Sequence, residues 1–160
     1  MISIIKNNCQ KDYPRNIVSM DRVLIDTDVI LDFFFDREPY SDHAAQIISL
    51  CESKQIKGFI TPVICCNVYY LLRQTANHKK VIEKLSQLLT IMDVLQMDRE
   101  VIIQALNSGF NDFEDALQNY SAVKSGFIDV ILTRNIKDFS KSDIGILSPE
   151  SYLKSRSASR

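Results

Sequence analysis

The sequence contains no tryptophan, two histidines, and only four residues each of glycine, proline and cysteine. This scarcity of glycine and proline, with 46% hydrophobic residues, excludes a collagen-like or disordered chain. No stretch approaches the roughly 20 apolar residues that a membrane-spanning helix needs, and the N-terminus lacks the apolar segment of a signal peptide. We therefore expect a globular, cytoplasmic protein, and its 160 residues are enough for one ordinary domain but not for two.

The cysteines show no CxxC spacing, and Cys65 and Cys66 are adjacent within an apolar run. Only His43 and His78 are available as imidazole ligands, so a zinc site is not expected. We expect free, buried thiols in a reducing compartment.

The formal net charge is −1, with basic residues concentrated towards the two ends and acidic residues in the body of the chain. An acidic body is poorly suited to unspecific DNA binding, which depends on lysine and arginine contacts to phosphates. It suits a protein that gathers carboxylates around a divalent cation.

The first nineteen residues are polar and have no sustained hydrophobic period, and Met20 directly precedes the first clear strand. We expect residues 1–19 to be an N-terminal extension outside the core, residues 20–155 to form one domain, and residues 156–160 to be a flexible tail.

From Arg22 onward, short apolar runs alternate with segments of helical period. Strands separated by helices indicate a mostly parallel sheet with helices on both faces, which is a three-layer α/β fold. The expected strands are residues 23–25, 58–61, 91–95, 127–132 and 144–147.

Acidic residues lie at the ends of strands or the starts of helices. Asp26 ends the first strand, with Asp28 two residues later; Asp112 and Asp115 begin a helix; Asp138 follows the fourth strand. Taken singly, each is explained by a helix cap, a favourable helix-dipole position or a turn.

Together these residues indicate a site, because ligands bind open parallel sheets where several strands present their carboxyl ends. Two carboxylates about 4 Å apart repel by roughly 4 kcal/mol at a partly buried surface, and a cation relieves that repulsion. Mg²⁺ or Mn²⁺ prefers oxygen ligands, and such a site can hydrolyse a phosphodiester without a histidine or cysteine nucleophile.

Three segments, residues 23–32 (VLIDTDVILD), 112–118 (DFEDALQ) and 131–139 (ILTRNIKDF), resemble in order and spacing the PIN-domain family. This family comprises metal-dependent ribonucleases and includes the VapC-type toxins of bacterial toxin–antitoxin pairs. The resemblance covers about residues 22–153. It implies a PIN-like nuclease domain, an RNA substrate, Mg²⁺ or Mn²⁺ as cofactor, a possible cognate antitoxin and a homodimer.

The resemblance also implies roles by position. Asp26 and Asp115 match the metal-binding aspartates, and Asp112 and Asp138 match acids that complete the catalytic set. Arg134 is placed to contact RNA phosphate, with a surface ion pair as the alternative. The supporting polar residues are Asp28, Asn67, Thr133 and Asn135.

One position departs from the family pattern. Many relatives carry a glutamate on the helix after the second strand, whereas this sequence offers Asn67. Asparagine supplies a neutral oxygen but no charge and no general base. The alternative function is therefore a catalytically weak or inactive module that binds RNA or a partner.

A lesser alternative is a phosphatase of the haloacid-dehalogenase type, because residues 26–29 (DTDV) also resemble its nucleophile motif. Asp26 would attack phosphorus and Asp28 would act as general acid. That family needs a later lysine and paired acids, whereas Lys124 precedes its strand and Asp138 stands alone.

The adjacent Tyr69 and Tyr70 could stack on RNA bases. Their helical spacing with Val68 and Leu72 favours packing in the core or at an interface instead.

Overall fold

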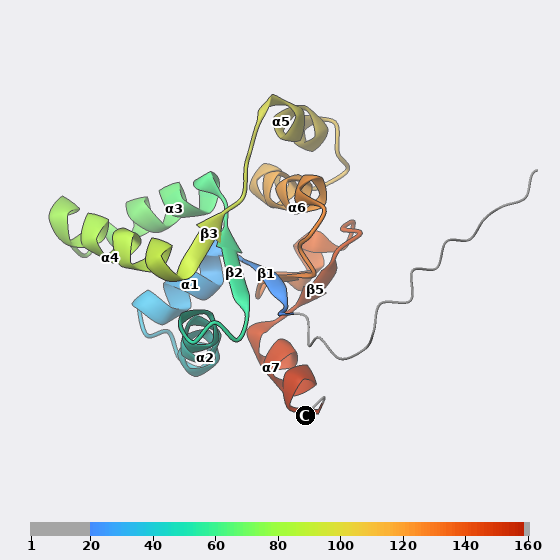
Figure 1. Cartoon of the computed structure of the whole chain (residues 1–160). Coiled ribbons are helices and arrows are strands. Elements are labelled where there is room, and N and C mark those ends of the chain that lie inside the picture. The colour runs from blue at the N-terminus through green and yellow to red at the C-terminus, as the bar shows by residue number, and fades with distance from the viewer. Residues whose placement is uncertain (1–19, 159–160) are drawn as a thin grey trace, which may run out of the picture.

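The computed structural model describes residues 20–158, which form a five-stranded, all-parallel sheet flanked by helices (Figure 1). The expected three-layer α/β fold is confirmed. In chain order the elements are β1 (Arg22–Ile25), α1 (Thr27–Phe34), α2 (Ser41–Glu52), β2 (Lys57–Ile60), α3 (Pro62–Leu72), α4 (His78–Ile91), β3 (Met92–Val94), α5 (Arg99–Leu106), α6 (Phe113–Ser125), β4 (Val130–Leu132), the 3₁₀ helix η1 (Ile136–Phe139), β5 (Gly145–Leu147) and α7 (Pro149–Ala158).

The strands lie in the order β3-β2-β1-β4-β5, so β1 is central. The chain adds β2 and β3 on one side of β1, and then β4 and β5 on the other. The neighbours β1 and β4 therefore form the switch point of the sheet, where ligands bind in open α/β folds. Ile25 pairs with Leu132, and the Asp26 amide donates to the Leu132 carbonyl at 3.0 Å. The residues that follow these two strands consequently emerge side by side.

Local sequence determines where several helices begin and end. Thr61 follows β2 and caps α3, because its hydroxyl accepts from the Ile64 amide at 3.2 Å, and Pro62 occupies the first turn. Asp98 caps α5 in the same way. Gly126 ends α6 in the left-handed conformation (φ 70°), which glycine adopts without strain.

The helices form two groups. Figure 1 shows α1 to α4 gathered on one side of β2, whereas α5 and α6 form a separate pair. The first group shares the main apolar core with the central strands. A smaller apolar cluster joins α5 to α6 through Val101, Ala105, Ala116 and Leu117. The contact between α5 and α6 therefore has its own apolar cluster, while Ala122 joins α6 to the main core.

Some boundaries differ from the expectations. Strand β4 begins at Val130 instead of at residue 127, because the chain after Gly126 first leaves the end of α6. Residues 156–158 belong to α7, so the expected tail is helical there. The expected extension, residues 1–19, lies outside the described residues, as do residues 159–160.

The cysteine prediction is only partly right. Cys51 is buried and Cys65 is half-buried, but Cys66 is exposed, and all three are free. The buried face of α3 is formed by Ile64, Val68 and Leu72, and Cys66 lies away from this face. Cys9 lies outside the described residues.

Among residues 20–158, none of the helices combines the length and the apolar character that crossing a membrane requires.

Candidate metal-binding cleft

A cleft of about 760 Å³ opens where β1 and β4 end. It is lined by carboxylates from three parts of the chain, together with several amide, arginine and apolar side chains. The carboxylates are Asp26, Asp28, Asp112, Glu114, Asp115 and Asp138. The structure thus brings the five aspartates singled out in the sequence to one cleft, with Asn67 and Asn135 also in its lining.

Asp26 is the most deeply placed of these acids, with 5% of its surface exposed. It follows β1 and caps α1: its Oδ1 accepts from the Thr27 amide at 2.7 Å, and its Oδ2 accepts from the buried Thr133 hydroxyl at 2.8 Å. Burial raises the pKa of Asp26, and the two hydrogen bonds oppose that rise. Asp26 is therefore a helix cap as well as part of the cleft.

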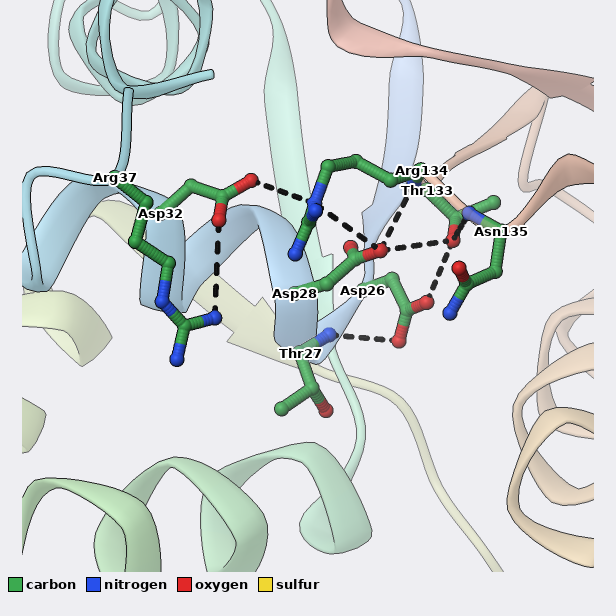
Figure 2. A network of polar contacts seen from close by, with 8 residues as sticks. All are labelled: Asp26, Thr27, Asp28, Asp32, Arg37, Thr133, Arg134 and Asn135. Atoms are coloured by element: carbon green, nitrogen blue, oxygen red, sulfur yellow. Dashed lines mark hydrogen bonds and ion pairs between the residues drawn. The ribbon is translucent and has the colours of Figure 1, made fainter. Parts of the chain in front are cut away.

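The Asp28 carboxylate accepts hydrogen bonds from residues that directly follow β4. Its Oδ2 accepts from the Arg134 amide at 3.0 Å and lies 3.5 Å from the Thr133 hydroxyl. Burial, followed by the charge of Asp26, raises the pKa of Asp28 to about 6. Figure 2 shows Asp26 and Asp28 side by side, with Thr133 between them and the turn to Asn135.

The Arg134 side chain turns towards α1 (Figure 2). Its Nε lies 2.9 Å from Asp32 Oδ2 and 3.8 Å from Asp28 Oδ2, and its guanidinium stacks over the Tyr40 ring at 4.4 Å. Asp32 is 1% exposed and also lies 3.8 Å from Arg37 Nη1. The Arg134 guanidinium is thus ion-paired with the carboxylates of Asp32 and Asp28. An ion pair was the alternative to contact with RNA phosphate; the phosphate contact itself stays a prediction.

The opposite side of the cleft is formed by the start of α6. Asp112 Oδ1 caps this helix by accepting from the Glu114 and Asp115 amides at 2.9 and 3.1 Å. Asp115 is half-buried, and its pKa is raised to about 7 by burial and then by the charges of Asp26, Asp112 and Asp138. These acids, distant in sequence, therefore repel one another across the cleft.

The turn after β4 and helix η1 complete the lining. Asn135 and Asp138 are exposed there, and the backbone N–H of Asn135 donates to the Thr133 hydroxyl at 3.0 Å. Thr133 thus connects the η1 turn to Asp26.

Glu114 was not assigned a role from the sequence. Its Oε1 accepts from Asn67 Nδ2 at 2.5 Å, and from the Thr27 hydroxyl and Gln118 Nε2 at 3.3 Å each. Glu114 on α6 thus places a carboxylate against the side-chain amide of Asn67 on α3. The signal in the sequence was the i, i+4 spacing of Glu114 and Gln118, which puts both on one helix face.

The donor set fits a hard divalent cation in its chemistry, because it consists of carboxylate and amide oxygens whose negative charges repel one another. Asp28 Oδ1 is buried and has no hydrogen-bond partner within residues 20–158. In the described part of the chain, however, no three histidine, cysteine or acidic side chains lie close enough together to hold an ion. Binding therefore requires the carboxylates to move towards the ion.

Comparisons with known proteins identify the family and the fold. The family model described as PIN domain matches residues 22–137. Ribonuclease VapC1 of Aquifex aeolicus (strain VF5) is 24% identical over 140 residues, which cover 84% of this chain and 95% of that protein.

Solved structures share the fold. VapBC-1 from nontypeable Haemophilus influenzae has a TM-score of 0.59 at 14% identity, covering 81% of this chain and 98% of that one. Mycobacterium tuberculosis VapC20, described as a sarcin–ricin loop cleaving toxin, has a TM-score of 0.58 at 16% identity, covering 74% and 95%. With most of its length matched by the family model, and with the acids gathered at the switch point of the sheet, the chain belongs to the PIN domain family.

Proposed function

We propose that this chain is a Mg²⁺- or Mn²⁺-dependent endoribonuclease that hydrolyses RNA phosphodiester bonds in the acidic cleft. The observation that carries the proposal is the convergence of six carboxylates beside the switch point of the sheet, one of which, Asp26, is buried. Family membership and the similarity to a protein named ribonuclease VapC1 support the same chemistry.

Asp26 and Asp115 would hold the cation, with Asp112, Asp138 and Glu114 adding negative charge around it. A bound Mg²⁺ or Mn²⁺ supplies a Lewis acid for phosphate oxygens and lowers the pKa of water. Because all of its ligands would be oxygens, the site selects hard cations.

The chain's own residues set the geometry around that site. The Thr133 hydroxyl and the Thr27 amide fix the two oxygens of Asp26, so this carboxylate has one defined orientation. The Asn67 amide does the same for Glu114. With a pKa of about 7, Asp115 can carry a proton at neutral pH when the cation is absent, which makes cation binding and proton release coupled events.

The biological context follows from family resemblance. We include in the proposal a toxin role, a cognate antitoxin partner, a homodimer and a cytoplasmic location. The similar structures include proteins named VapBC, among them the one from Haemophilus influenzae. A small DNA-binding protein encoded by the neighbouring reading frame would support the antitoxin.

The first test is cleavage of single-stranded RNA with Mn²⁺ and with excess EDTA. We expect cleavage with Mn²⁺ and none with EDTA. Asp26→Asn and Asp115→Asn should each lower the rate at least 10²-fold, because each removes a charge that would bind the cation. Asp143→Asn is the matched control: Asp143 is exposed, and its substitution should leave the rate within twofold.

Each alternative function has its own result. Cleavage that persists in EDTA or in both variants would refute the proposal. RNA binding without cleavage at any metal concentration would identify the inactive module. An acyl-phosphate trapped on Asp26 would identify the phosphatase.

A further inference from the structure

Within residues 20–158, Tyr70 is the one aromatic residue that lines the cleft. It lies on α3, 69% of its surface is exposed, and it contributes to the same lining as Asp26 and Asp115. The buried face of α3 is formed by Ile64, Val68 and Leu72. Of the two packing roles expected from the sequence, packing in the core is therefore wrong for Tyr70, and packing at an interface stays a prediction.

The neighbouring tyrosine supports the Tyr70 ring. Tyr69 is half-buried against the main core, and its hydroxyl is hydrogen-bonded to His78 Nδ1 at 3.0 Å. The Tyr69 and Tyr70 ring centroids are 5.2 Å apart, with the planes at 78°. This edge-to-face contact holds Tyr70 from one side and leaves most of the ring accessible.

The lining of the cleft therefore contains two chemically different kinds of side chain. Beside the acids, Tyr70, Leu71 and Leu31 supply an aromatic ring and aliphatic surface. A nucleotide of single-stranded RNA has the same division, with a phosphate that binds through a cation and a flat base that stacks on an aromatic ring.

We propose that Tyr70 is a nucleobase-binding residue, on whose ring one base of single-stranded RNA stacks while the adjoining phosphate lies at the acids. This inference rests on the proposed function and adds a substrate contact to it. Stacking on one aromatic ring tolerates any of the four bases, so Tyr70 contributes affinity with little sequence preference.

The binding test uses tryptophan fluorescence, because the chain has no tryptophan of its own. In an Asp115→Asn background, in which cleavage should be at least 10²-fold slower, Tyr70→Trp places a single reporter at the proposed contact. We expect quenching when a ten-nucleotide single-stranded RNA is added with Mg²⁺, because the base would cover the indole. Leu106→Trp in the same background is the control. Leu106 is 67% exposed on α5, and a tryptophan there should not respond.

The kinetic test separates binding from chemistry. Tyr70→Ala should raise KM about 5- to 150-fold, the range given by loss of one base–aromatic stack, with kcat within about threefold of wild type. Tyr70→Phe should restore the wild-type KM because it keeps the ring. Leu106→Ala, a matched loss of exposed apolar surface, should have no effect.

The outcomes distinguish this inference from the proposed function. If wild-type protein cleaves RNA but Tyr70→Ala leaves KM unchanged, the base contact is refuted and the nuclease stands. If no cleavage occurs, the fluorescence titration alone decides the contact. Quenching by inorganic polyphosphate, which has no base, to the same extent as by RNA would refute stacking.

Discussion

The two sides of the cleft carry the same kind of acid but hold it differently. On the β1–α1–β4 side, the fixed side, Asp26 and Asp28 accept hydrogen bonds from Thr27, Thr133 and Arg134. On the α6–η1 side, the open side, no hydrogen bond within residues 20–158 reaches the carboxylates of Asp115 or Asp138. Part of the open side packs separately: Ala116 and Leu117 of α6 belong to the smaller apolar cluster, whereas Ala122 of α6 and Phe139 of η1 share the main core with the fixed side.

This difference explains why the acids converge without forming a complete set of ligands. On the fixed side, hydrogen bonds hold the Asp26 carboxylate in a defined orientation at the switch point of the sheet. On the open side, Asp112 and Glu114 accept hydrogen bonds, whereas the half-buried Asp115 and the exposed Asp138 carboxylates accept none within residues 20–158 and can rotate towards an ion. The fixed side therefore orients the Asp26 carboxylate, and the side chains of Asp115 on α6 and Asp138 on η1 can adjust to an ion.

The largest expected effect comes from breaking the fixed side at Asp32. Asp32→Ala would leave Arg134 without its closest carboxylate, and we expect unfolding free energy to fall by about 2–4 kcal/mol, measured by urea denaturation. Asp32→Asn keeps the size of the side chain and an oxygen that can accept from Arg134, and should cost about half as much. RNA cleavage should fall as well, because the backbone N–H of Arg134 also donates to the Asp28 carboxylate.

Asp143→Ala controls for loss of an exposed acid and should change stability by less than about 0.5 kcal/mol. Equal stability of wild type and Asp32→Ala would show that the ion pairs do not hold the fixed side.

Asp115, on the open side, should contribute to the pH dependence without metal near neutral pH. The pKa of Asp115 is raised to about 7, so the folded protein holds a proton there between about pH 4 and 7 that the unfolded chain has released. The stabilisation that comes from the proton on Asp115 is therefore fully present below pH 4 and is lost as the pH rises through 7. Asp28, with a pKa of about 6, acts in the same direction at lower pH.

We expect the melting temperature in EDTA to fall by about 2–4 °C between pH 6 and 8, the shift that about 1 kcal/mol gives in a domain of this size. The effect stays that small because Asp115 is half-exposed and solvent screens its charge. Asp115→Asn should flatten the profile, and millimolar Mn²⁺ should raise the melting temperature at pH 8. A wild-type profile that rises over this range would contradict the assigned repulsion.

The sequence predicted the acids of the cleft better than their partners. Asp26 and Asp138 were placed correctly near strand ends because strand position depends on local pattern and on the order of the sheet. The contact between Glu114 and Asn67 depends on how α6 faces α3, which no local pattern encodes. The pairing of Arg134 with Asp32 was not predicted for the same reason, because it depends on how the turn after β4 faces α1.

The smallest expected effect comes from the outer edge of the fixed side, at Tyr40. Its ring covers the Arg134 guanidinium at 4.4 Å and is itself 43% exposed. Tyr40→Leu keeps the apolar bulk but removes the ring, and should cost about 0.5–1 kcal/mol of unfolding free energy, because a half-exposed cation–π contact is worth about that much. Cleavage should stay unchanged, since the ion pair to Asp32 keeps Arg134 in place. A loss in cleavage as large as that in Asp32→Ala would instead mean that the ring, more than the buried carboxylate, positions Arg134.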